Sequence, residues 1–203
     1  MSEGAIRAHF SKIAVRRLRA LPDGKGAEIR ERVTPEFFER VRSASADEWM
    51  PIDDVIVFSD AIADVLGEQG GRDFWTALML DTYDTGMLRH LVAGVRESHA
   101  GREGALQLLR LAPAAWGLAA RDCGSIVLEA APDGGIRLSS GDLLPSIVRS
   151  RGIHCVFYGA CMSMLAQFRV RATIDVRADP EDPHKIVFAI HQEREDPPSQ
   201  AER

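Results

Sequence analysis

The sequence predicts an α+β fold, in which an N-terminal helical bundle is followed by a β-hairpin, a long helix and a second β-hairpin forming a small antiparallel sheet. Three observations support this prediction. Apolar residues recur at helical spacing through the first half of the chain. A strong turn sequence, Pro-Asp-Gly-Gly at 132–135, joins two short strand-like runs. A segment rich in small residues, 146–168, then runs into two further strands.

The front half of the chain is predicted to contain about six short helices. The first covers residues 4–21 and ends at a Pro-Asp-Gly stretch. A Thr-Pro pair at 34–35 begins the second, because the threonine can cap it and proline suits a first helical turn. The third runs over 52–67 and ends at Gly67 as a C-cap. The remaining helices are expected over 74–85, 86–98 and 103–113.

The back half is predicted to consist of two hairpins separated by the long helix. The first hairpin pairs strands at 125–130 and 135–140. The second pairs 170–178, where apolar and polar residues alternate as in a half-buried strand, with 185–190. The long helix at 146–168 has one apolar stripe, made of Ile153, Val156, Phe157, Ala160 and Met164.

Length and composition favour one globular domain. The 203 residues are 45% hydrophobic, which is enough for a core, and no internal repeat or linker divides them. We therefore expect a single α+β domain over 1–192. The last stretch, 193–203, is charged and contains prolines, and is expected to be a disordered tail.

Net charge, cysteine content and hydropathy indicate which partners and which cellular compartment to expect. The formal net charge of −5 gives no general attraction to nucleic acid, so no nucleic-acid partner is expected. Three cysteines, an odd number, argue against a disulfide framework and favour a reducing cytoplasm. No apolar run reaches the roughly 20 residues that span a bilayer, and no signal peptide is evident.

The densest cluster of reactive side chains lies on the long helix, at His154, Cys155, Tyr158 and Cys161. Positions 154, 158 and 161 share a helical face, so they could line a ligand site or act as a thiol- or metal-dependent sensor. Positive charge from His154 could also activate Cys155. The alternative is ordinary packing, with both cysteines serving as small buried hydrophobes.

The expected aromatic walls of a ligand pocket between the helical front and the long helix are Trp75, Trp116 and Phe74. Core packing of these rings is the alternative. No serine lies in a nucleophile-elbow sequence and no phosphate-binding loop follows a strand, so no catalytic residue is assigned and the protein is not expected to be an enzyme.

Five short landmarks stand out along the chain: Trp49-Met50-Pro51, Leu66-Gly67, Pro113-Ala114-Ala115-Trp116, Gly152 and Tyr158-Gly159-Ala160. In this order they resemble a chiefly myxobacterial family of proteins of this length, catalogued as a domain of unknown function. The resemblance covers roughly residues 4–192.

The back half is also similar to the 4-vinyl-reductase-type ligand-binding domain, whose superfamily includes haem-nitric-oxide-binding proteins and transport-particle (TRAPP) subunits. The resemblance implies binding of a small hydrophobic ligand, or dimerisation and scaffolding of partner proteins. Two departures matter. Residues 177–188 contain no cysteine pair, and the tyrosine-serine-arginine haem-propionate motif is missing. No haem, metal or other cofactor is therefore expected.

The resulting interpretation is a non-enzymatic cytoplasmic signalling module that binds a small hydrophobic ligand or a protein partner. Its expected ligand-binding residues are Trp75, Trp116, His154, Cys155, Tyr158 and Cys161. Two alternatives remain open: a ligand-free adaptor that works as a homodimer or with a partner protein, and a thiol- or metal-dependent sensor using Cys155 and Cys161.

Overall fold

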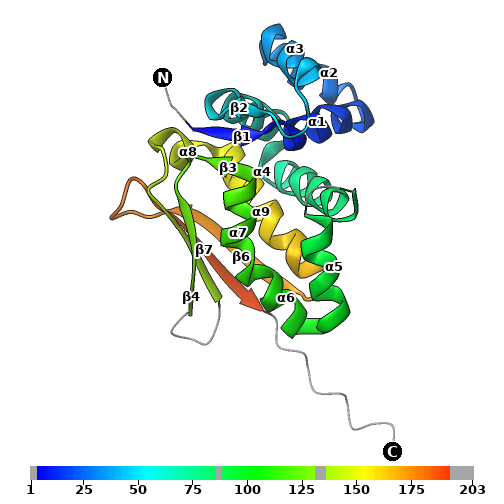
Figure 1. The fold of residues 1–203 in the computed structure, drawn as a ribbon. Helices are drawn as coiled ribbons and strands as arrows, with labels where there is room; N and C mark the ends of the chain where they lie inside the picture. Colours follow the sequence, from blue (N-terminus) through cyan, green and yellow to red (C-terminus); the bar gives the residue numbers. More distant parts are fainter. Residues whose placement is uncertain (1–3, 86–87, 131–135, 193–203) are drawn as a thin grey trace, which may run out of the picture.

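The computed structural model describes residues 4–85, 88–130 and 136–192. It is an α+β structure, as predicted, with a helical front half followed by hairpin, helix and hairpin. Figure 1 shows the N-terminal helices gathered at one end, with the longer sheet and its covering helices below them. The predicted turn at 132–135 and the predicted tail at 193–203 lie outside the described residues.

The elements follow one another in this order: β1 (Ala5–Arg7), α1 (Ala8–Arg17), a 3-10 turn (Leu18–Ala20), α2 (Lys25–Glu31), α3 (Pro35–Ser43), β2 (Trp49–Pro51), α4 (Ile52–Thr85), α5 (Arg89–Ser98), α6 (Gly101–Arg110), α7 (Ala112–Ala119), β3 (Ala120–Arg121), β4 (Ser125–Ala130), β5 (Ile136–Gly141), α8 (Pro145–Arg149), α9 (Arg151–Ala166), β6 (Ala172–Ala178) and β7 (Ile186–Gln192).

The two predicted hairpins join into one antiparallel sheet of four strands in the order β4-β5-β7-β6. Leu138 of β5 stands opposite Leu128 of β4 and Phe188 of β7. Along β6, Ile174 and Val176 are buried and the residue between them is exposed, so the predicted alternation is confirmed. Helices α7 and α9 lie on the same side of this sheet (Figure 1), where they cover its apolar face.

A second, three-stranded sheet was not predicted. Its order is β2-β1-β3, and Ile6 at its centre stands opposite Met50 on one side and Ala120 on the other. A strand therefore occupies residues 5–7, and the prediction of a helix from residue 4 was wrong there. Strands of two or three residues are too short for a period-2 pattern, so only tertiary pairing reveals them.

Other helices also differ from the prediction. Helix α2 was missed, and Pro113 lies in the first turn of α7 instead of ending a helix, as its missing N–H allows. The predicted helix over 146–168 is two helices, α8 and α9, because Ser150 adopts an extended backbone between them.

Gly67 marks a kink, as its expected role as a helix stop suggests, but the helical run continues on both sides of it as α4. Its φ of 72° lies in the left-handed region, where glycine carries no Cβ penalty. The predicted second helix is therefore present, but it begins directly after the kink and not at residue 74.

Helices α4 and α9 form the most extensive contact between elements of the described structure. Two glycines of α9 make it possible. A Cβ on Gly152 would overlap the carbonyl carbon of Ser59, and a Cβ on Gly159 would lie 2.6 Å from that of Trp75. The backbones therefore meet without intervening side chains at both points.

The carboxylate of Asp60 in α4 caps the start of α9. The Oδ1 atom of Asp60 accepts hydrogen bonds from the Gly152 backbone N–H at 2.7 Å and from the Ser150 hydroxyl at 2.8 Å. Ser150 Oγ in turn accepts from the Ile153 N–H at 3.0 Å. Negative charge at a helix N-terminus is favourable, so this cap both satisfies orphan donors and sets the position of α9.

We expect Gly159→Ala to lower the free energy of unfolding by about 1–3 kcal/mol, because its Cβ would overlap the α4 backbone. Urea unfolding followed by circular dichroism measures the change. The matched control is Gly94→Ala in α5, where a Cβ would meet nothing within 4 Å. The control should be neutral or stabilising by up to about 1 kcal/mol, since alanine is the better helix former. Equal effects of the two substitutions would contradict the close contact.

Candidate functional site

The candidate site is a cavity of about 120 Å³ between the two halves of the protein. Both halves supply its walls: Ile6 and Phe10 come from β1 and α1, and Trp75 comes from α4. The four-stranded sheet contributes Leu138 of β5 and Phe188 of β7. The lining is almost entirely apolar, and the cavity is partly open to solvent.

Helix α9 forms one wall with the stripe predicted from the sequence. Its five members, Ile153, Val156, Phe157, Ala160 and Met164, all line the cavity. The stripe faces the cavity because an adjacent side of α9, roughly 100° around the helix axis and bearing Gly152 and Gly159, is held against α4 by the contact described above. The amphipathic pattern and the close helix contact together point this apolar face inward.

Helix α7 forms a facing wall of small side chains around one aromatic ring. Ala112, Ala115 and Ala119 recur at helical spacing and line the cavity together with Trp116. The Trp116 ring lies 5.3 Å from that of Phe157, and its Nε1–H donates to the Gly124 carbonyl at 3.1 Å. A single residue therefore links α7, α9 and the loop before β4.

Few polar atoms reach this lining. The Tyr83 hydroxyl lies 3.1 Å from the Ser163 hydroxyl, which donates to the Ala160 carbonyl at 2.8 Å. Burial raises the pKa of the Tyr83 hydroxyl above its ordinary value of 10.0, so it stays neutral. The Trp75 Nε1–H is buried and has no acceptor among the described residues. Sequence reasoning missed Tyr83; its only signal was a tyrosine among the apolar positions of α4.

Cys161 lines the cavity as a neutral thiol. Burial raises its pKa from 9.0 to about 12, because a thiolate would lose its hydration in this apolar environment. The other two cysteines, Cys123 and Cys155, are also free and buried, with raised pKa values. At neutral pH none of the three has the thiolate character of a reactive or metal-binding cysteine.

The six residues proposed from the sequence do not form one site. Trp75, Trp116 and Cys161 line the apolar cavity. His154 and Cys155 line a different, polar pocket of about 160 Å³. Tyr158 lines neither, and its ring lies under the Arg72 guanidinium at 4.7 Å.

Helix geometry explains this division. Positions 154 and 161 point in nearly the same direction, but seven residues separate them by about 10 Å along the axis. Cys161 therefore reaches the apolar interior, whereas His154 stays near the start of α9. There its Nε2 lies 2.9 Å from the Val148 carbonyl oxygen, and burial lowers its pKa below 6.5.

The polar pocket is balanced in charge. Arg72 pairs with Glu68 of the same helix, and Arg151 pairs with Asp64. Cys155 Sγ lies 3.7 Å from the Glu68 carbonyl oxygen. Both arginines that line the pocket thus have a carboxylate partner, so neither is left to attract an anionic ligand.

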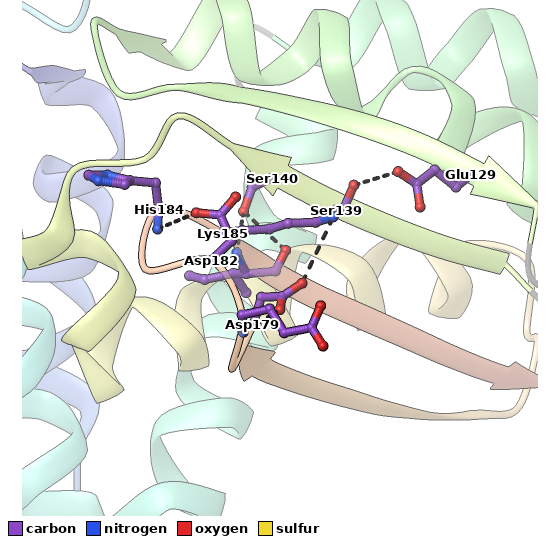
Figure 2. Close-up of polar contacts among 9 residues, drawn as sticks. Glu129, Ser139, Ser140, Asp179, Asp182, His184 and Lys185 are labelled. Atoms are coloured by element: carbon purple, nitrogen blue, oxygen red, sulfur yellow. Dashed lines mark hydrogen bonds and ion pairs between the residues drawn. The ribbon is translucent and has the colours of Figure 1, made fainter.

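A second polar cluster spans β4, β5 and the turn between β6 and β7, and its polar groups bond to one another and to neighbouring backbone. In Figure 2 the Ser139 hydroxyl reaches Glu129, at 3.0 Å, and the His184 backbone N–H reaches Asp182, at 2.9 Å. His184 Nδ1 also lies 2.9 Å from the Leu143 carbonyl oxygen. The first contact joins β5 to β4, and the two contacts of His184 hold the turn between β6 and β7 against Leu143 in the loop before α8.

No metal centre emerges from the described residues, since nowhere among them do three His, Cys, Asp or Glu side chains gather as ligands would. In the same part of the chain, no helix is both long and apolar enough to cross a membrane.

Comparison with known proteins identifies the fold. No family model and no curated protein matches the chain. Among solved structures, an H-NOX protein from S. oneidensis in its Fe(II)NO state superposes with a TM-score of 0.61 at 11% identity, covering 93% of this chain and 100% of that one. The unliganded Fe(II) H-NOX protein from K. algicida gives 0.57 at 10% identity, covering 94% and 98%.

A third neighbour, a mutant of the H-NOX protein from T. tengcongensis, gives a TM-score of 0.56 at 11% identity and covers 93% of this chain and 98% of that one. The chain therefore has the H-NOX fold, which agrees with the haem-nitric-oxide-binding part of the resemblance seen in the sequence. Kinship with the myxobacterial family, the 4-vinyl-reductase domain and the TRAPP subunits stays a prediction.

The buried titratable groups predict a stability maximum between about pH 6.5 and pH 9. Burial lowers the pKa of His9 and His154, so their contribution is present above pH 6.5 and is lost as the pH falls below it. Burial raises the pKa of Cys123 to about 11 and that of Cys161 to about 12, so their contribution is present below pH 9 and is lost as the pH rises through those values. Urea unfolding across pH 4–11 tests this, and stability still rising above pH 10 would contradict it.

Proposed function

We propose that the protein is a non-enzymatic sensory module that binds a small apolar molecule in the cavity between α4, α7, α9 and the sheet. One observation carries the proposal: a nearly all-apolar space bounded by both halves of the chain. Ligand sites are commonly concave, largely apolar and placed where structural units meet. A molecule bound there would contact both halves and could bias their arrangement.

The structural neighbours support a sensory role. They are H-NOX proteins, some of them described in Fe(II) or Fe(II)NO states and others through the distortion of their haem. Fold alone does not determine function, so the proposal for this chain depends on the residues of its own cavity.

Those residues do not fit a haem. Among the described residues that line the cavity there is no histidine to bind iron and no arginine or lysine to pair with propionates. The sole thiol among them is Cys161, which stays protonated because burial raises its pKa to about 12. The rings of Trp75 and Phe157 instead form part of the wall. The proposed sensing is therefore independent of haem.

Binding of a partner protein is the second candidate function, either as a homodimer or with another chain. Two exposed apolar side chains favour it: Leu118 of α7 is 45% exposed and Val127 of β4 is 48% exposed. Val127 follows Ile126, which lines the cavity, so Val127 lies on the outer face of the sheet, whereas Leu118 lies on the solvent side of α7. A partner bound over Leu118 could therefore respond to a ligand bound beside α7. A cytoplasmic location, proposed from the unpaired cysteines, fits both candidates.

A thiol- or metal-dependent sensor is the least supported of the three. Cys155 and Cys161 line different pockets, and burial raises the pKa of both thiols. A redox or metal response would need an accessible thiolate, which neither side chain provides at neutral pH.

The haem-free proposal predicts that purified protein titrated with hemin develops no protein-bound Soret band. Native mass spectrometry of freshly purified protein should show either the bare chain or a small organic adduct, without iron. Myoglobin apoprotein, treated in parallel, is the positive control. A stoichiometric Soret complex would overturn the haem-free proposal. The absence of any response to apolar ligands in thermal melts would overturn ligand binding itself.

A further inference from the structure

We infer that the ligand of the cavity is an uncharged, hydrocarbon-like molecule about the size of one aromatic ring, and that the small side chains of α7 set this size limit. The inference rests on the proposed function and adds the chemical class of the ligand, its lack of charge and the helix that limits its size. Three features of the cavity carry it: its volume, the absence of charge from its described lining, and the chemistry of α7.

Volume sets the size. The cavity measures about 120 Å³. An engineered protein cavity of about 150 Å³, lined by similar apolar side chains, stays dry and binds benzene. A single ring or a branched chain of comparable bulk therefore fits, whereas a porphyrin or a long acyl chain exceeds the space.

Charge and polarity set the chemical class. No charged side chain is found among the described residues that line the cavity. An ion placed there would lose its hydration without gaining a partner, which is strongly unfavourable. The Tyr83 hydroxyl already lies 3.1 Å from that of Ser163, and the buried indole N–H of Trp75, which has no acceptor among the described residues, carries no charge to offset that of an ion. A carboxylate or ammonium group on the ligand would therefore find no ionic partner among these residues.

Helix α7 gives the cavity its outer boundary. Ala112, Ala115 and Ala119 face inward, whereas the neighbouring Ala114 and Leu118 are exposed to solvent. α7 packs mainly on β4, with smaller contacts to β3 and α6. A larger side chain at an inward position would occupy ligand space, and the same side chain one residue earlier would point to solvent.

Ala115→Leu and Ala114→Leu form the decisive pair, since they place the same change on the same helix. Binding of toluene, measured by isothermal titration calorimetry and by tryptophan fluorescence, is expected for the wild type and for Ala114→Leu with equal Kd. Ala115→Leu should weaken binding at least ten-fold. Benzoate, the charged counterpart of toluene, should not bind the wild type, and neither should decanoate, which is both charged and long.

Each contrary outcome has a defined meaning. Benzoate or decanoate binding without toluene binding overturns the inferred ligand class but leaves a ligand-binding module in place. Equal toluene binding by both variants places the ligand elsewhere and also overturns the inference. Failure of toluene, benzoate, decanoate and hemin alike removes the proposed function together with the inference. If Ala115→Leu does not fold by circular dichroism, Ala119→Leu replaces it, and the wild-type contrast between toluene and benzoate already decides the ligand class.

Discussion

The backbone contact between α4 and α9 is the constraint on which the rest of the structure depends. Gly152 and Gly159 let the two helices meet where any Cβ would overlap the backbone of α4. Asp60 fixes the axial position of α9 through hydrogen bonds to Ser150 and to the first turn of the helix. With one side held in this way, the apolar stripe of α9 must face the sheet and α7.

The cavity follows from that arrangement. The stripe of α9 meets the sheet through the edge-to-face contact of Phe157 with Phe188, whose ring centroids lie 5.1 Å apart. It meets α7 through the ring of Trp116, because the other inward residues of α7 are alanines. The space left beside these alanines is bounded by apolar atoms, so the same packing that builds the core also leaves room for a small neutral molecule.

Sequence patterns predicted the regular elements well and the composition of the site only in part. The alternation of β6 and the stripe of α9 were readable because each spans enough residues to show a period. Helical periodicity shows which residues share a face, but not which pocket each of them lines. His154 and Cys155 line a different pocket from Cys161, because their distance along the helix axis and the elements packed around them decide this. Tyr83 was marked only as a tyrosine among apolar positions, and nothing in the sequence indicated that the alanines of α7 would line a cavity.

By itself the sequence determined the α+β order, the paired hairpins and the inward stripe of α9, because these depend on local propensity and on spacing within one element. The tertiary structure alone decided the three-stranded sheet, the start of α7 at Ala112 and the assignment of each reactive side chain to its pocket. Those features arise from contacts between segments far apart in the chain, such as Ile6 with Ala120 and Asp60 with Gly152. A local sequence pattern does not show which distant residue a side chain will contact. That contact determines whether a histidine or cysteine has a chemical role or only packs in the core.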